Sequence, residues 1–207
     1  MNVLVVKANN RPDGISTKMF DTYIDEVSKV ANLNVSIYDV FEEEMPYLGQ
    51  ELFDAIGKLQ NGEELLDVES RLLTAKQKAK DAVSGADVVV FAFPLWNLTI
   101  PARLHTFFDY ISEVGFSFKY NEQGQLVGLL EGKKVVILCA SGGVYSTPEM
   151  KPLEMAANYV RNTTVGVFGM TLADEVIIEG HNANPLKAEE IIGEGLERVR
   201  ASIHNLA

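Results

Sequence analysis

Three short segments of this sequence carry residue types that suit binding of an anion and a flat ring. The first spans residues 8–18 and ends in the hydroxyl residues Ser16 and Thr17, where a helix is expected to begin. Free backbone N–H groups, the helix dipole and nearby hydroxyls together form an anion site. Ordinary N-capping by Ser16 is the simpler interpretation of this segment alone, and a helix N-terminus can serve both purposes.

The second segment, residues 93–101, reads FPLWNLTIP and directly follows a run of apolar residues. Leu95 and Trp96 can cover a flat ring, while Asn97 and backbone amides can hydrogen-bond to the ring edge. The alternative is a hydrophobic strand-to-helix turn with Pro101 at the start of the helix. The position after a buried strand modestly favours binding.

The third segment, residues 139–146, reads CASGGVYS. Paired glycines let the backbone approach a ligand closely, although a flexible turn has the same composition. Ser141 is not part of a G-x-S-x-G elbow, so a hydrolase nucleophile is disfavoured. Three such segments at one sheet edge make a stronger argument than any one of them.

Other reactive residue types are scarce. The single cysteine, Cys139, lies in an apolar run and suits a buried strand position, and an intrachain disulfide is impossible. With only three histidines, a His-rich metal site is not expected. His181 follows the end of the last expected strand and could lie near a pocket mouth, although a surface loop is the simpler interpretation. Neither a Walker A loop nor a G-x-G-x-x-G turn is present.

Composition is that of a globular protein, with 47% apolar and 23% charged residues among 207. The net charge of −11 disfavours binding to nucleic acid or to an anionic membrane surface. The longest apolar run, 88–96, is too short to span a bilayer. We expect a cytoplasmic protein, because no signal peptide opens the chain and the one thiol is unpaired.

Five strand-like runs alternate with helical patterns, which indicates an α/β fold. The strands are expected at 3–6, 35–38, 88–93, 135–138 and 176–178. The helices are expected at 18–30, 70–83, 102–111, 152–168 and 186–203. Right-handed crossovers then give a doubly wound, five-stranded parallel sheet of order 2-1-3-4-5 with helices on both faces. The three segments meet at the carboxyl end of that sheet, where ligands of such folds bind.

Two stretches exceed this minimal pattern. Residues 40–70 form an insertion with some helix at 50–60, and residues 116–128 suggest a small hairpin. We interpret residues 1–207 as a single domain.

In this order along the chain, the serine-containing first segment, PLWNL, GFSFKY, SGG and IEG resemble the bacterial FMN-dependent NADH azoreductases. These are flavodoxin-like NAD(P)H:quinone oxidoreductases. The first segment departs from the family, because Gly14 stands where members often carry the first serine of Ser-x-Ser.

The resemblance implies a homodimer that binds FMN tightly but non-covalently and uses NADH. Its implied cofactor-binding residues are Asn9, Gly14, Ile15, Ser16, Thr17, Pro94, Leu95, Trp96, Asn97, Leu98, Ala140, Ser141, Gly142 and Gly143. The implied substrate-pocket residues are Phe118, Tyr120, Tyr145 and Phe168, the last contributed by the partner chain.

The implied activity is transfer of a hydride from NADH through FMN to quinones and azo compounds in a two-electron, ping-pong cycle. Azo bonds would be cleaved to amines, and no catalytic side chain is needed because the flavin carries the chemistry. A flavodoxin-type electron carrier without an organic substrate is the alternative. A phosphoacceptor domain with the same sheet order is disfavoured, because no pair of aspartates follows the first strand.

Overall fold

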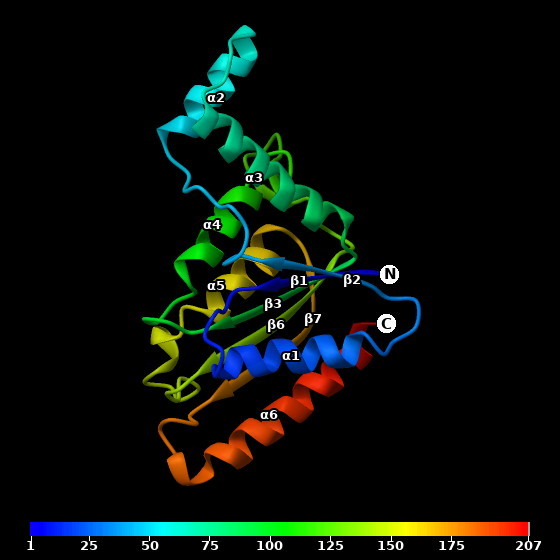
Figure 1. Ribbon diagram of the computed structural model, residues 1–207, viewed down its shortest axis with the longest axis vertical. Coiled ribbons are helices and arrows are strands. Elements are labelled where there is room, and N and C mark those ends of the chain that lie inside the picture. Colours follow the sequence, from blue (N-terminus) through cyan, green and yellow to red (C-terminus); the bar gives the residue numbers. More distant parts are fainter. Residues whose placement is uncertain (207) are drawn as a thin grey trace.

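The computed structural model describes residues 1–206. A five-stranded parallel sheet of order β2-β1-β3-β6-β7 forms its centre (Figure 1). The strands are β1 (Asn2–Lys7), β2 (Asn34–Asp39), β3 (Val88–Pro94), β6 (Lys134–Ser141) and β7 (Thr171–Glu179). The predicted order and fold class are confirmed.

The burial of each strand follows its place in the sheet. Every residue of central strand β3 is buried, whereas the edge strand β2 buries only Tyr38. A strand covered on both faces needs a continuous apolar run, which is why β3 reads VVVFAFP.

Helices cover both faces of the sheet (Figure 1). On one face, α1 (Ile15–Val27) and α6 (Ala188–Ser202) pack side by side. On the other face lie α3 (Asp67–Gly85), α4 (Ala102–Ile111) and α5 (Ala157–Arg161). The alternating side chains of the strands feed two separate cores: Val5 and Val90 face Met19 and Tyr23 of α1, while Phe91 faces the helices opposite.

The two stretches outside the minimal pattern form regular structure. The first contains α2 (Gln50–Asn61), which packs on α3 and extends away from the sheet (Figure 1). The second is an antiparallel hairpin of β4 (Phe118–Tyr120) and β5 (Leu126–Gly128). Helix and hairpin were both predicted in these places.

The helix expected over 152–168 is broken into pieces. A 3-10 turn at Lys151–Leu153 precedes α5, and a π-helical stretch, Asn162–Val167, follows it. β-Branched residues crowd this stretch, and the Thr164 hydroxyl donates to the Val160 carbonyl oxygen at 2.7 Å, which competes with regular helical bonding. Within residues 1–206, no helix combines the length and apolarity needed to cross a bilayer.

Candidate functional site

The carboxyl ends of β1, β3 and β6 lie side by side, because these strands are neighbours in the sheet. Their register pairs Lys7 with Ala92 and Pro94 with Ala140, so the three following loops leave the sheet at nearly one level. A cavity of about 200 Å³ opens there. From the predicted segments, its walls include Gly14, Ile15, Ser16, Pro94, Leu95, Trp96, Ala140 and Gly142. We call this cavity the rim cavity.

The first loop ends in the N-terminus of α1. Gly14 is the N-cap and no side chain caps the helix, so the expected N-capping by Ser16 is wrong. Ser16 instead lies in the first turn, which contains no acidic residue. The N–H groups of 15–17 precede the first helical hydrogen bond, from Lys18 N to Gly14 O at 3.1 Å. These amides are available to an anion at the positive end of the helix dipole.

Asn9 and Thr17 hold the first loop against the sheet. The Asn9 amide nitrogen donates to the Ser16 carbonyl oxygen at 3.4 Å and to the Ala92 carbonyl oxygen at 3.3 Å. The Thr17 hydroxyl lies 2.9 Å from Asn9 Oδ1 and 2.7 Å from the Arg11 carbonyl oxygen. The two side chains therefore hydrogen-bond to each other, to the first loop and α1, and to β3, and they position the α1 N-terminus.

The second loop makes a tight reversal at the rim. Trp96 N donates to Thr99 O at 2.9 Å, and Thr99 N donates back to Trp96 O at 3.1 Å. Between them Asn97 and Leu98 have φ values of 51° and 71°. Two consecutive left-handed residues are the mark of a type I′ turn, which is costly for a side chain such as leucine. The strained pair directly follows Trp96, which lines the cavity, and backbone strain is a common feature of ligand-binding loops.

The third loop is fixed from two sides. Ser141 Oγ donates to the Gly143 carbonyl oxygen at 3.0 Å, and the Glu179 carboxylate accepts a hydrogen bond from Tyr145 N at 2.7 Å. A Cβ added at Gly142 would collide with the Asn182 side chain. The third loop therefore requires glycine at 142 because the β7–α6 connection lies directly against it.

The β7–α6 connection forms a fourth wall, and the sequence analysis did not name its Asn182. Gly180 N donates to Gly143 O at 3.0 Å, and Asn182 N donates to Gly142 O at 3.1 Å. These bonds bring His181 and Asn182 into the lining of the rim cavity, together with Arg11. His181 thus lies on a partly exposed loop that also lines the cavity, which is the pocket position that the sequence analysis named second. The only available signal was its place directly after the last strand of the sheet.

Comparisons with known proteins agree with this arrangement. A family model described as the flavodoxin-like fold matches residues 1–203. An FMN-dependent NADH:quinone oxidoreductase 3 of Bacillus cereus is 44% identical over 199 residues, which is 94% of each chain. The chain belongs to this flavodoxin-like family of FMN-dependent NADH:quinone oxidoreductases.

Two further relatives support the same membership. An FMN-dependent NADH:quinone oxidoreductase of Shouchella clausii is 43% identical over 200 residues, 96% of each chain. The crystal structure of an azoreductase from Bacillus anthracis superposes with a TM-score of 0.88 at 42% identity, covering 97% of both chains.

A second, larger cavity of about 480 Å³ lies beside the rim cavity, between α5 and the edge strand β7. Leu95 lines both cavities. Tyr145 and the carboxylate-bearing Glu179 also line the larger one, so its mouth is continuous with the third loop. Of the predicted substrate-pocket residues, Tyr145 is the one placed in a cavity at this rim.

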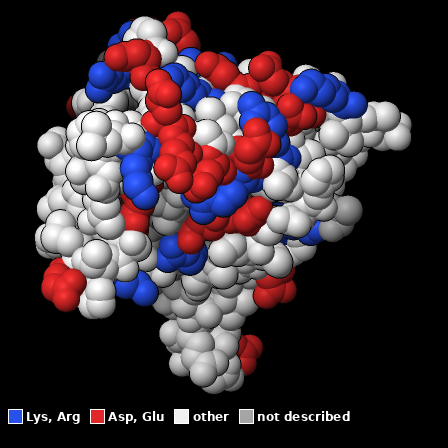
Figure 2. Space-filling model, turned by 90° about the horizontal axis from the view of Figure 1, so that it is seen from below, with Lys and Arg blue, Asp and Glu red and all other residues white. Residues whose placement is uncertain are grey.

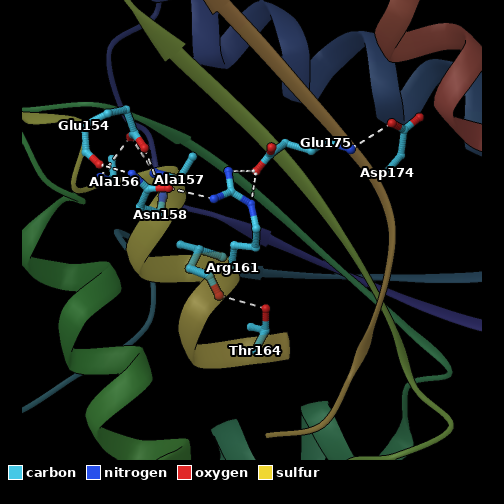
Figure 3. A network of polar contacts seen from close by, with 9 residues as sticks. Glu154, Ala156, Ala157, Asn158, Arg161, Thr164, Asp174 and Glu175 are labelled. Carbon is cyan, nitrogen blue, oxygen red and sulfur yellow. Dashed lines mark hydrogen bonds and ion pairs between the residues drawn. The ribbon is translucent and has the colours of Figure 1, made fainter. Parts of the chain in front are cut away.

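The wall of this second cavity is a polar network around α5 (Figure 3). Glu154 Oε1 accepts hydrogen bonds from Ala156 N at 2.9 Å and Ala157 N at 2.7 Å, and its Oε2 accepts one from Asn158 N at 3.0 Å. One turn later Arg161 Nη2 lies 2.6 Å from Glu175 Oε1 on β7. The network ties the short helix to the edge strand, and Glu154, Asn158, Arg161 and Glu175 all line the cavity between them.

The other predicted pocket residues lie away from the rim. Phe118 and Tyr120 are on the hairpin, whose Gly128 packs against Phe168 and Gly169 at the amino end of β7. Phe168 has no exposed surface and its ring contacts Phe108 in the core. The structure therefore does not support Phe168 as a substrate-pocket residue contributed by the partner chain, because its side chain completes the core beneath α4.

Neither the single cysteine nor any metal-binding cluster adds a second site within residues 1–206. The Cys139 side chain is buried, and burial raises the pKa of its thiol well above the ordinary value, so it suits a core position and not a nucleophile. No cluster of His, Cys, Asp and Glu in the described part of the chain could hold a metal ion. Figure 2 shows acidic and basic side chains intermixed on one face, without a broad basic patch.

Proposed function

We propose that this chain is an FMN-dependent oxidoreductase that passes a hydride from NADH through FMN to quinones and azo compounds. One observation carries the proposal: three loops with unpaired backbone donors surround a single cavity at the carboxyl edge of the sheet. Relatives that are 43–44% identical over nearly the whole chain carry the corresponding name.

The first loop fits the phosphate of FMN. The N–H groups at 15–17, which have no backbone acceptor within residues 1–206, and Ser16 in the first turn lie at the positive end of the α1 dipole. Glycine at position 14 avoids a tight contact, because a Cβ would stand 3.1 Å from the Arg11 carbonyl oxygen. We assign Asn9 and Thr17 to this site as residues that hold the loop in place.

The second and third loops fit the flat ring. Leu95 and Trp96 supply apolar surface, and Trp96 is 37% exposed, which leaves its indole free to cover a ligand. Neither the Asn97 amide nor the Leu98 amide donates to a backbone group elsewhere in residues 1–206. The amides at Gly142 and Gly143 would face the ring from the third loop, where Ala140 and Ser141 end β6.

Bound FMN would supply the hydride-accepting and hydride-donating chemistry. The protein would contribute placement: apolar surface from the second loop excludes water from one side of the ring. Fixed N–H donors in the second and third loops would stabilise negative charge at the ring edge, as preorganised dipoles do. No side chain is proposed as a catalytic acid or base.

We propose that NADH and the acceptor use the same open face in turn, which is a ping-pong cycle. Tyr145 and the larger cavity lie beside that face, so they are the expected contact surface for the acceptor. Parallel lines in double-reciprocal plots would support sequential use of one site, whereas intersecting lines would exclude it.

We further propose a homodimer. The α2–α3 extension exposes a set of large apolar side chains, which a monomer rarely tolerates: Tyr47, Phe53, Ile56, Leu59, Leu66 and Val68. The exposed Tyr120 on the hairpin lies at the end of the sheet opposite the rim, so it can reach a rim cavity only in another copy. Phe118 lies on the same hairpin.

We also propose a cytoplasmic location, because NADH is an intracellular reductant.

The decisive experiment is spectroscopic. Purified protein should carry, or take up in stoichiometric amount, a yellow chromophore released as FMN on denaturation. NADH added under nitrogen should bleach it, and a quinone should restore the colour. Protein that does not bind FMN would overturn the proposal, and protein that binds FMN but is not reduced by NADH would indicate a flavodoxin-type electron carrier.

A further inference from the structure

The segment that follows β2, residues 40–46, reaches the second loop through an aromatic contact. It leaves the sheet at the same carboxyl edge as the three predicted loops, because β2 runs parallel to β1. The Phe41 ring meets the indole of Trp96 edge-on, with the ring centroids 6.3 Å apart and the planes at 66°. Aromatic pairs prefer this edge-to-face geometry. Because Trp96 lines the rim cavity, the contact connects a further crossover to the wall of that cavity.

Hydrogen bonds fix the backbone that carries Phe41. Its own N–H donates to Asp39 Oδ1 at 2.9 Å, and the N–H groups of the next two residues, Glu42 and Glu43, donate to the Asp39 carbonyl oxygen at 3.1 and 3.0 Å. The Asp39 carboxylate is in turn tied to β1, because Lys7 Nζ lies 2.7 Å from its Oδ2. The turn at the end of β2 therefore presents the Phe41 ring from a defined position.

Arg103 of α4 holds the same segment from a second direction. Its Nη1 donates to the Val40 carbonyl oxygen at 2.8 Å and to the Glu43 carbonyl oxygen at 3.1 Å. Its guanidinium carbon lies 6.0 Å from the centroid of the Phe41 ring, which is within the range of a cation–π contact. The two carbonyl groups flank Phe41 along the chain, so one arginine fixes the backbone on both sides of the ring and also contacts the ring.

Trp96 depends on support from outside its own loop. The indole is partly exposed, and it directly precedes the left-handed pair Asn97 and Leu98. A side chain that becomes ordered only when a ligand arrives loses rotamer freedom at that moment, which weakens binding. A neighbouring ring that already holds the indole removes this cost.

We propose that Phe41, held in place by Arg103, is a positioning residue that fixes the Trp96 indole as a wall for the flavin ring of FMN. The inference rests on the proposed function, because it adds a positioning pair to the same cofactor site. Neither Phe41 nor Arg103 is among the described residues that line the rim cavity, so both act on a ligand through Trp96. Their effect should therefore concern the flavin ring and not the phosphate.

Tryptophan fluorescence tests the arrangement without a cofactor. Trp96 is the only tryptophan among the 207 residues, so the emission reports on this one side chain. In apoprotein, Phe41→Leu keeps apolar bulk but removes the ring; it should lower the anisotropy and raise the acrylamide quenching constant roughly twofold, because a freed indole samples more exposed rotamers. Phe41→Tyr keeps the ring and should match wild type. An indole that is equally ordered in Phe41→Leu and wild type would overturn the inference.

Binding of two flavins separates the ring from the phosphate. Phe41→Leu should raise the Kd for FMN and the Kd for riboflavin by the same factor, about two- to tenfold, as expected for loss of one aromatic pair. Riboflavin has the same ring but no phosphate, so a loss confined to FMN would overturn the inference. If wild type binds FMN and Phe41→Leu frees the indole without changing either Kd, the inference fails alone. If wild type binds neither flavin, the proposed function fails and this inference fails with it.

A double-mutant cycle tests the part played by Arg103. Arg103→Gln should raise both Kd values, and Phe41→Leu combined with Arg103→Gln should be no worse than Phe41→Leu alone, because Arg103 acts through Phe41. Additive losses would show that the two residues act independently and would overturn this step. Arg71→Gln is the matched control, since it removes only exposed ion pairs, with Glu44 of the same segment and with Asp67, and should match wild type.

Discussion

The side chain of Asn182 lies directly against Gly142, so a Cβ at position 142 would collide with it. The two residues belong to different crossovers, the third loop and the β7–α6 connection, and are joined by the bond from Asn182 N to Gly142 O at 3.1 Å. The close packing of these two cavity-lining residues therefore depends on the absence of a side chain at position 142.

Gly142→Ala should weaken FMN binding on the order of tenfold, because relieving the overlap costs about 1–3 kcal/mol and moves the loop. The Kd for FMN is measured by quenching of flavin fluorescence. Adding Asn182→Ala should restore most of the affinity, because the colliding group is removed. Gly193→Ala in α6, where a Cβ meets nothing within 4 Å, is the control and should bind FMN normally. Failure of the double variant to recover would contradict the packing argument.

Leu98 should tolerate glycine better than a β-branched residue. Its φ of 71° is in the left-handed region, where Cβ branching raises the steric cost. We expect Leu98→Val to lower the free energy of unfolding by about 1–2 kcal/mol and Leu98→Gly to leave it nearly unchanged, because relief of strain offsets lost contacts. Urea denaturation measures both. An equal loss in the two variants would show that contacts of the side chain, and not backbone strain, dominate at this position.

Glu154 should be needed for the start of α5. Its carboxylate accepts three backbone N–H groups, so Glu154→Ala leaves them without an acceptor and should cost roughly 1–2 kcal/mol of stability. Glu154→Gln keeps an acceptor oxygen and should cost less. Hydrogen exchange at Ala157 and Asn158 is the local readout. Unchanged protection in Glu154→Ala would contradict the capping role.

Glu69 should make stability depend on pH. Hydrogen bonds from Lys58 and from Leu66 N lower the pKa of its carboxyl from the ordinary 4.5. A lowered carboxyl pKa stabilises the folded state above the ordinary value, and this contribution disappears as pH falls through the folded-state pKa. Glu69→Gln should therefore destabilise the protein at neutral pH and match wild type in strong acid.

The matched control for Glu69 is Glu64→Gln, an exposed residue just before α3. Its unfolding free energy should follow wild type at every pH. A loss in Glu69→Gln that is the same at neutral and acid pH would show that packing, not charge, explains the effect.

Phe53 should be part of the surface between two copies. It is 64% exposed on α2, within the apolar set of the α2–α3 extension. Phe53→Glu should raise the dimer dissociation constant on the order of tenfold or more, because a charge replaces a large apolar contact at a buried surface. Light scattering across protein concentrations measures the mass. Leu186→Glu, which changes an exposed side chain outside this apolar set, is the control. If both variants change the dimer dissociation constant equally, the α2–α3 extension is not the dimer interface.

The sequence alone determined the sheet order and the three loops at its carboxyl edge. Continuous apolar runs such as that of β3 and the alternation of strands with helices are local patterns, and the right-handed crossover rule converts them into topology. The loop between β3 and α4 was recognisable for the same reason, because Trp96 and Asn97 follow a buried strand directly.

Only the tertiary structure decided what depends on distant segments. His181 and Asn182 line the rim cavity because β7 pairs with β6, a relationship that no local pattern around residue 181 expresses. A phenylalanine such as Phe168 suits a ligand pocket and a protein core equally well, so its residue type does not decide between them. Its burial against Phe108 follows from how α4 packs on the sheet. Side-chain type limits what a residue can do, whereas long-range packing decides which cavity, if any, it faces.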